Sequence, residues 1–309
     1  MKVLITSNSF GKFDNGPKQK MLDLGWEVVG NRYHHIMNEE EMIGEVPGVD
    51  AIILGSDCLN KNVLDHADKL KIISRYGVGL DNVDLEEAKQ RGIEVTITRN
   101  CNTEAVADYT IALMLDTLRH VSQVDRDLRA GNWKKETGLD LCHKTVGVIG
   151  LGAIGRQVVK RLHGFDCKIL GFDLYPNEAF CKENNVELLP VEEILKQADV
   201  ITLHIPANED GSPVISKKEL DLMKSTAVLI NSARAALVDQ DAVIEALKTG
   251  KIYGYGTDVF KEEPHMDPEF AELNNAVLSP HNAAVSVEAV NKMTALSVQH
   301  ILDYFKVSE

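Results

Sequence analysis

A glycine-rich turn between a strand and a helix is the feature that most limits how this chain can fold. Gly150, Gly152 and Gly155 form the pattern G-x-G-x-x-G. The apolar run 145–149 leads directly into this turn, and a helix-forming run, RQVVKRL, follows it. The next apolar run, 168–172, is followed by an acid, Asp173. This βαβ setting is the fingerprint of a Rossmann domain that binds a dinucleotide.

Each part of the fingerprint has its own physical task. The first glycine permits the tight turn, the second lets the backbone approach a pyrophosphate, and the third lets helix and strand pack closely. The N-terminus of the helix offers unpaired N–H groups and a positive dipole end to the phosphates. Asp173 would accept hydrogen bonds from the adenosine ribose and would repel a 2′-phosphate. Residues 174–176 include no arginine to attract such a phosphate, so the pattern predicts NAD rather than NADP.

Short apolar runs alternate with helical patterns along most of the chain. This alternation predicts parallel sheets that helices cover on both faces. The expected strands of the first series are 2–6, 26–29, 50–54, 71–74 and 93–97, and those of the second are 145–149, 168–172, 200–205, 227–231, 253–259 and 276–279. A broadly apolar helical pattern from about 102 to 121 joins the two series. A chain of 309 residues has room for two such α/β units.

A final helix is expected from about residue 286 to about 305. Its pattern alone leaves open whether it completes the second unit or crosses back to the first.

Composition narrows the classes of partner. The chain has 33 Lys and Arg against 47 Asp and Glu, a formal net charge of −14. A surface this acidic repels nucleic-acid backbones and anionic lipids, so we expect neither a nucleic-acid nor a membrane partner. No run approaches the roughly 18–20 apolar residues of a membrane helix, and the first residues lack the features of a signal peptide. The five cysteines form no C-x-x-C pair, which favours reduced thiols and a cytoplasmic location.

Three charged side chains follow successive strands of the second series. Arg234 follows the run 227–231, Glu263 follows 253–259, and His281 follows 276–279. Ligands of a doubly wound sheet bind beyond the carboxyl ends of its strands, so these side chains are expected to converge near the cofactor. Any one of them alone is more often an ordinary surface residue.

The three together suit reversible oxidation of a hydroxy acid. Such a reaction loses a hydride to the nicotinamide and a proton to a base, and His281 is the expected base. Glu263 would orient the imidazole and stabilise its charged form. Arg234 would grip the substrate carboxylate with its planar fork.

Other candidate groups carry less weight. His34 and His35 are adjacent, which is not the helical spacing of metal ligands. His204 falls within an expected strand and reads as a packed core residue. Cys142 and His143 precede the first cofactor strand without a neighbouring pattern that would make a nucleophile. The sequence therefore predicts no metal site.

The chain resembles the D-isomer-specific 2-hydroxyacid dehydrogenases, and it is most similar to their phosphoglycerate dehydrogenase-like branch. The matching motifs extend over nearly the whole chain. They are Ser74-Arg75-Tyr76-Gly77-Val78-Gly79-Leu80-Asp81-Asn82-Val83-Asp84, Asn231-Ser232-Ala233-Arg234, Leu237-Val238-Asp239, Asp258-Val259-Phe260, Glu263-Pro264 and Pro280-His281.

The resemblance implies an organisation and an activity. It implies a Rossmann NAD-binding domain at 100–285 and a flavodoxin-like substrate (lid) domain at 1–99 plus 286–309. The helix after the hinge would support a homodimer. The implied activity is reversible, NAD-dependent hydride transfer with a small anionic 2-hydroxy or 2-keto acid, like that of a D-3-phosphoglycerate dehydrogenase.

The resemblance also implies roles for further residues. The backbone of Gly77, Val78 and Gly79 would hold the substrate carboxylate, and Asp258 would contact the nicotinamide amide. Arg75 would either contact the anion or brace its loop. The remaining residues that would line the cofactor are Ala153, Ile154, Ile205 and Ser232.

Several departures from the family pattern leave the substrate open. Gly55 stands where some phosphoglycerate dehydrogenases carry an arginine for the substrate phosphate. His143 replaces a frequent glycine, and Ala235-Ala236 and Arg99-Asn100 replace Gly-Gly and Pro-Gly. A glyoxylate/hydroxypyruvate reductase and a dehydrogenase of a phosphonate-like analogue are therefore alternatives. An NADH-sensing, corepressor-like binding protein is the alternative from a different class.

Overall fold

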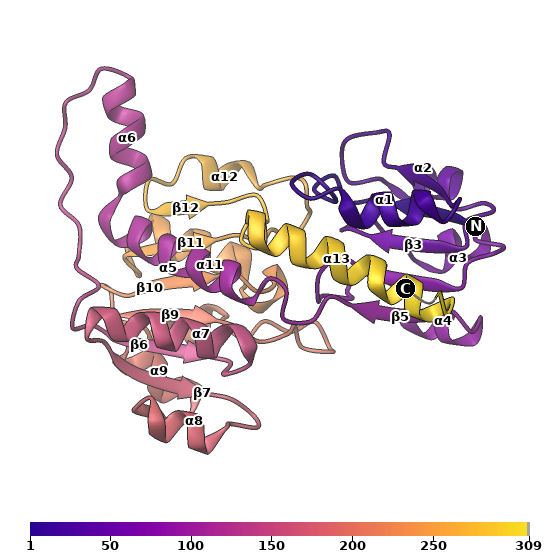
Figure 1. Ribbon diagram of the computed structural model, residues 1–309. Helices are drawn as coiled ribbons and strands as arrows, with labels where there is room; N and C mark the ends of the chain where they lie inside the picture. The colour runs from indigo at the N-terminus through magenta and orange to yellow at the C-terminus, as the bar shows by residue number, and fades with distance from the viewer. Residues whose placement is uncertain (308–309) are drawn as a thin grey trace. The chain divides into compact units, whose positions relative to one another are not determined.

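The computed structural model describes residues 1–307, which form two α/β units (Figure 1). One unit contains Met1–Asn102 and the C-terminal segment from Ala284, and the other contains Thr103–Ala283. The chain therefore leaves the first unit after residue 102 and returns to it after residue 283. The family resemblance implied that these crossings lie after residues 99 and 285.

The first unit is built on a sheet of five parallel strands in the order β2-β1-β3-β4-β5. This is the flavodoxin-like order of doubly wound folds. The strands are β1 (Lys2–Ile5), β2 (Glu27–Gly30), β3 (Ala51–Leu54), β4 (Ile72–Arg75) and β5 (Glu94–Ile97). The helices are α1 (Gly16–Asp23), α2 (Glu39–Glu45), α3 (Lys61–Asp65), α4 (Leu85–Gln90) and α13 (Val287–Tyr304).

The final helix, α13, packs against α1, β3 and β4 of the first unit. It begins after Ser286, whose Oγ accepts a hydrogen bond from the Ala289 N–H at 3.1 Å. The Tyr76 hydroxyl donates to the carbonyl oxygen of Val290 at 2.9 Å. The helix therefore crosses back to complete the first unit.

The second unit is built on seven parallel strands in the order β12-β11-β10-β9-β6-β7-β8. The strand order reverses at β6, which is the doubly wound arrangement of a Rossmann fold. The strands are β6 (Thr145–Ile149), β7 (Lys168–Phe172), β8 (Val186–Leu188), β9 (Val200–Leu203), β10 (Val228–Asn231), β11 (Gly254–Thr257) and β12 (Ala276–Leu278). The helices are α5 (Thr103–Arg119), α6 (Val121–Arg129), α7 (Ala153–Leu162), α8 (Glu178–Glu183), α9 (Val191–Gln197), α10 (Lys217–Leu222), α11 (Gln240–Lys248) and α12 (Pro268–Ala271).

Both faces of the second sheet are buried, as its apolar strands predicted. Leu229 of β10 enters one apolar cluster, while its neighbours Val228 and Ile230 enter another. The second cluster includes residues of α5 and α7, which pack against each other. The predicted fold class, two parallel-sheet α/β domains, is confirmed.

Two elements were not predicted, and several strands are shorter than expected, β9 and β11 most of all. The edge strand β8 has only three residues, and two of them are exposed, so it lacks an apolar run. Helix α6 has no buried residue, although Val121, Val124 and Leu128 form a short apolar stripe. Strand β9 ends at Leu203, so His204 lies just beyond the strand and not within it. No helix in residues 1–307 is long and apolar enough to cross a membrane.

Candidate active site

The glycine-rich turn joins β6 to α7 at the carboxyl edge of the second sheet. Gly150 has φ +101°, and a Cβ there would lie 2.4 Å from the carbonyl oxygen of His204. A Cβ on Gly155 would lie 1.9 Å from the carbonyl oxygen of Gly150. A Cβ on Gly152, by contrast, would meet nothing within 4 Å. The turn is thus packed from behind and open at the start of α7, which fits the pyrophosphate of a dinucleotide.

Asp173 lies immediately after β7 and holds the same turn. Its Oδ2 accepts a hydrogen bond from the Leu151 N–H at 2.7 Å, and its Oδ1 accepts one from the Tyr175 N–H at 2.8 Å. Each carboxylate oxygen has a second lone pair, so both can still accept a ribose hydroxyl. The contact with Leu151, which ties the turn to the end of β7, was not foreseen from the sequence.

His281 and Glu263 form a hydrogen-bonded pair. His281 Nδ1 lies 2.7 Å from Glu263 Oε2, and Glu263 Oε1 accepts a hydrogen bond from the Phe260 N–H at 3.1 Å. The Glu263 side chain is 24% exposed and the His281 side chain is 44% exposed. The imidazole is therefore anchored on one nitrogen and accessible to a ligand.

The pair shifts the protonation of both members. The hydrogen bond to Glu263 raises the pKa of His281, and this outweighs partial burial, which would lower it. Burial by itself would raise the pKa of Glu263, but the hydrogen bond and charge of His281 lower it overall. Both shifts favour an imidazolium beside a carboxylate.

Arg234 lies just beyond β10, near this pair. Its positive charge acts to lower the pKa values of both Glu263 and His281. Its Nη1 donates to the carbonyl oxygen of Ala233 at 2.7 Å, and its own carbonyl oxygen accepts from Asn231 Nδ2 at 2.8 Å. Glu263 and His281 thus meet as predicted, and Arg234 lies within electrostatic reach of the pair.

Asp258 is buried at the end of β11 and shapes the turn that carries His281. Its Oδ1 accepts the N–H of Asn282 at 2.7 Å, and its Oδ2 accepts the N–H of Ala283 at 2.9 Å. The His281 N–H donates to the Asp258 carbonyl oxygen at 2.9 Å. Burial raises the pKa of Asp258 against these hydrogen bonds. The resemblance implied only that Asp258 contacts the nicotinamide. The structure shows that Asp258 also holds this loop.

Of the other residues expected to line the cofactor, three lie at the glycine-rich turn, and Ser232 directly follows β10. Ala153 and Ile154 are the first residues of α7. Ile205 is half-buried beside Gly150. The Ser232 hydroxyl lies 2.8 Å from the Thr110 hydroxyl of α5.

His204 is near the turn but is not placed to exchange a proton at neutral pH. Burial lowers the pKa of His204 to about 3. Its Nε2 lies 2.9 Å from the Thr202 hydroxyl. The ring is therefore a neutral, structural imidazole.

In the first unit, Arg75 braces the loop that follows β4. Its guanidinium donates to the carbonyl oxygens of Gly79 at 2.8 Å, Tyr76 at 2.7 Å and Leu54 at 3.2 Å. The Gly77 N–H donates to the Arg75 carbonyl oxygen at 2.9 Å and to Thr98 Oγ1 at 2.8 Å. Because the Gly77 amide is used in this way, the Val78 and Gly79 amides are the remaining backbone donors of the predicted anion loop.

Gly55, at the carboxyl edge of the same sheet, is packed against a buried acid. A Cβ on Gly55 would lie 3.0 Å from Asp57 Oδ2 and 3.2 Å from Thr6 Oγ1. Asp57 is 2% exposed, and its Oδ1 accepts the Met37 N–H at 2.7 Å. This position therefore has a carboxylate nearby and little room for a larger side chain.

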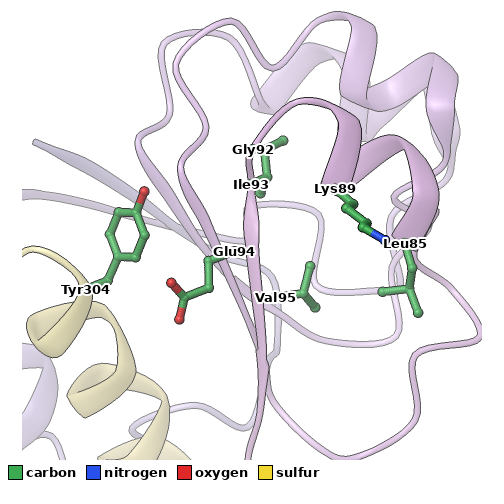
Figure 2. A pocket seen from close by; sticks show the side chains of 7 residues that line it. All are labelled: Leu85, Lys89, Gly92, Ile93, Glu94, Val95 and Tyr304. Atoms are coloured by element: carbon green, nitrogen blue, oxygen red, sulfur yellow. The ribbon is translucent and has the colours of Figure 1, made fainter.

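A surface pocket of the first unit lies elsewhere (Figure 2). It is formed by α4, β5 and the end of α13, and none of the predicted site residues lines it. Its lining residues are Leu85, Lys89, Gly92, Ile93, Glu94, Val95 and Tyr304.

Comparison with known proteins identifies the family. Residues 111–283 match the NAD binding domain of the D-isomer specific 2-hydroxyacid dehydrogenases. The chain belongs to this family. It is 39% identical to a glyoxylate reductase of Pyrococcus horikoshii over 92% of this chain and 88% of the relative. It is also 39% identical to a D-3-phosphoglycerate dehydrogenase of Methanocaldococcus jannaschii, over 82% of this chain and 49% of that longer relative.

The solved structures give the same assignment for this 2-hydroxyacid dehydrogenase. The structure of a D-lactate dehydrogenase from Aquifex aeolicus, complexed with NAD and lactic acid, superimposes with a TM-score of 0.84. It is 27% identical, and the match covers 98% of this chain and 95% of that one. The dehydrogenase is an NAD-dependent oxidoreductase acting on the CH–OH group of 2-hydroxy acids. The family, the enzyme class and the cofactor predicted from the sequence are confirmed.

Proposed function

We propose that this dehydrogenase reduces a short, unphosphorylated 2-keto acid of the glyoxylate or hydroxypyruvate class, and oxidises the matching 2-hydroxy acid in reverse. The proposal depends on one observation, which is that the buried carboxylate of Asp57 lies beside Gly55. Where a phosphoglycerate dehydrogenase would use an arginine, this chain has no side chain and a buried carboxylate nearby. A carboxylate repels a substrate phosphate. The similarity to a glyoxylate reductase supports the same substrate class.

In this proposal His281 is the acid and base. Its Nδ1 is engaged by Glu263, which leaves Nε2 to face the substrate oxygen. During reduction, Nε2 gives its proton to the carbonyl oxygen as carbon-2 gains the hydride. During oxidation the neutral ring removes the hydroxyl proton. Glu263 holds the ring orientation and stabilises the imidazolium.

We assign Arg234 of the second unit to the substrate carboxylate, and we assign the loop after β4 as an anion-binding loop of the first unit. The Arg234 guanidinium offers a planar pair of donors, and the Val78 and Gly79 amides offer backbone N–H groups. Arg75 acts as the brace of that loop, since its guanidinium already donates to three carbonyl oxygens. These local donors allow a protein of net charge −14 to bind a small anion.

The residues around the glycine-rich turn hold the cofactor. The amides at the start of α7, next to Gly152, bind the pyrophosphate, and Asp173 binds the adenosine ribose. Ile205 and Ser232 would line the remainder of the cofactor, and Asp258 holds the turn that carries His281. When bound, NAD supplies the hydride acceptor and NADH the hydride donor.

A substrate panel tests the proposal. NADH oxidation is followed with glyoxylate, hydroxypyruvate, pyruvate and phosphohydroxypyruvate, and again with NADPH in place of NADH. We expect kcat/KM for glyoxylate or hydroxypyruvate to exceed that for phosphohydroxypyruvate by at least about tenfold, a margin set by repulsion of the phosphate. A preference for phosphohydroxypyruvate would overturn the proposed substrate class. Tight NADH binding without turnover of any keto acid would instead indicate a cofactor sensor.

The assembly and location that we propose are a homodimer in the cytoplasm. Helix α6 and the segment after it extend away from the rest of the second unit (Figure 1). They expose Val121 (56%), Leu128 (53%) and Trp133 (86%) within 13 residues of sequence, and exposed apolar side chains that form a patch mark an interaction surface. A second copy of the chain would cover them. All five cysteines are free thiols, as expected in a reducing compartment.

A further inference from the structure

Three different metal-binding side chains meet at the amino edge of the second sheet. Cys142 and His143 form the turn before β6, and Asp166 lies just before β7. The Cys142 Sγ, a ring nitrogen of His143 and a carboxylate oxygen of Asp166 all lie within 4.8 Å of one another. Within residues 1–307 this is the one cluster of its kind.

Two hydrogen bonds hold these two turns together without any ion. The His143 N–H donates to the carbonyl oxygen of Phe165 at 2.9 Å. The Cys167 thiol donates to the carbonyl oxygen of Leu141 at 3.3 Å. The segment before β6 is therefore fixed to the segment before β7 on both sides of the cluster, and its side chains share one small space.

Two residues of the cluster, His143 and Asp166, have a left-handed backbone conformation. His143 has φ +62°, and Asp166 has φ +52°. Apart from glycine, the residues found most often in this left-handed region are asparagine, aspartate and histidine. The two left-handed turns therefore carry an imidazole and a carboxylate whose ligand atoms lie within 4.8 Å of each other and of the Cys142 thiol.

The three types of ligand indicate which metal ion the cluster would bind. Thiolate, imidazole and carboxylate together are the ligands of Zn²⁺, which binds them at about 2.0–2.3 Å in a tetrahedral arrangement. Such an arrangement separates ligand atoms by roughly 3.3–3.8 Å. Since all three side chains are exposed, rotamer changes can close the remaining gap while the backbone stays in place. Hard cations such as Mg²⁺ and Ca²⁺ prefer oxygen ligands alone.

We propose that Cys142, His143 and Asp166 form a binding site for Zn²⁺, with water in the fourth position. The site lies at the amino edge of the sheet, whereas the glycine-rich turn, Arg234 and His281 lie at the carboxyl edge. The ion takes no part in hydride transfer. It links the turn before β6 to the turn before β7, and its binding stabilises the folded second unit because the unfolded chain lacks the preformed cluster.

Metal binding by the full-length protein tests the proposal. The protein is stripped with a chelator, and Zn²⁺ is titrated in by calorimetry and by competition with a chromophoric chelator. We expect one ion per chain. Co²⁺ in place of Zn²⁺ should give the absorption of a tetrahedral site and a sulfur-to-cobalt charge-transfer band. Occupancy should also raise the melting temperature of the protein.

Three variants remove one ligand each and keep the backbone. Asparagine tolerates the left-handed conformation, so H143N and D166N are matched to their positions, and C142S is nearly isosteric. Each should weaken Zn²⁺ binding at least about tenfold, since loss of even an outer-shell partner costs about 10- to 100-fold. C142S should also lose the charge-transfer band. Circular dichroism of each variant checks that the fold is kept.

Two control variants lie outside the cluster. H34N replaces an exposed histidine with φ +61°, and C101S replaces a free cysteine of the first unit. Both should bind Zn²⁺ like the wild type. Absence of stoichiometric binding to the wild-type protein overturns the proposal. So does binding that C142S loses but H143N and D166N retain in full, because that result indicates a lone thiol.

Discussion

At the scale of single residues, one hydrogen bond decides how His281 titrates. The bond from Nδ1 to Glu263 Oε2 stabilises the imidazolium and raises the pKa of His281. The acid form needed for keto-acid reduction therefore persists to higher pH than for an isolated histidine. A group with a raised pKa in the folded state also contributes stability at low pH, and that contribution is lost as the pH rises through the folded-state pKa.

The variant E263Q should shift the pH profile of the enzyme. Without the carboxylate, the pKa of His281 falls, so kcat/KM for reduction should decline at a lower pH than in the wild type. The base form used in oxidation should appear at a lower pH as well. The measurement is kcat/KM against pH in both directions, with E262Q at the exposed neighbouring position as the control. Superimposable profiles for E263Q and the wild type would contradict the pairing.

The variant H281A should lower kcat by roughly 10²- to 10⁴-fold, the usual loss when a general acid–base group is removed. His281 has φ +53°, so H281N, which tolerates this backbone, separates loss of the imidazole from strain in the turn. Both variants should lose turnover in steady-state assays and still bind NADH. Turnover equal to that of the wild type in either variant would remove His281 from the mechanism.

At the scale of elements, the β6–α7 connection has two kinds of glycine. Gly155 lies against the Gly150 carbonyl and is required for the packing of helix on strand. Gly152 faces open space and matters only when a ligand approaches. The same motif thus serves the fold at one position and the cofactor at another.

The variants G155A and G152A should separate these two purposes. G155A places a methyl group 1.9 Å from a carbonyl oxygen. It should therefore destabilise the protein by at least about 1–3 kcal/mol, the usual cost of overpacking. G152A should unfold like the wild type but bind NADH more weakly. Denaturant unfolding and NADH fluorescence titration measure the two effects, and the opposite pattern would show that the roles are misassigned.

At the scale of the whole molecule, the exposed apolar side chains of α6 predict association between copies. The stripe of Val121 and Leu128 has no partner within the described chain that buries it. The apolar stripe can be recognised in the local sequence, but only the complete fold shows that it stays exposed.

If α6 forms the interface of the proposed homodimer, the variant L128D should be monomeric, since a charge cannot be buried in an apolar interface without a partner. Light scattering after gel filtration measures the mass in solution. L174D is the matched control, because Leu174 is also exposed (78%) but lies after β7, away from α6. A monomeric wild type, or an L128D variant that remains a dimer, would argue against α6 as the interface.

The sequence alone predicted every strand with a clear apolar run, the glycine-rich turn, and the contact of Glu263 with His281. The strands and the turn can be recognised from local sequence patterns. The site residues follow from the rule that ligands bind beyond the carboxyl ends of parallel strands. The sequence did not reveal β8, which is too short and too exposed to show a pattern. Helix α6 was also missed, because its apolar stripe is brief.

Only the tertiary structure decided features that join distant segments. The placement of α13 depends on contacts with α1, β3 and β4. The two hydrogen bonds that Asp258 accepts from the turn after His281, the bracing by Arg75, and the meeting of Cys142 with Asp166 depend on how separate loops pack. Periodicity and backbone preference are properties of neighbouring residues, so the sequence determines the elements and the chemistry at strand ends. Which side chains then share a hydrogen bond or a ligand is set by the folded backbone, because it alone brings residues far apart in the chain within a few ångströms.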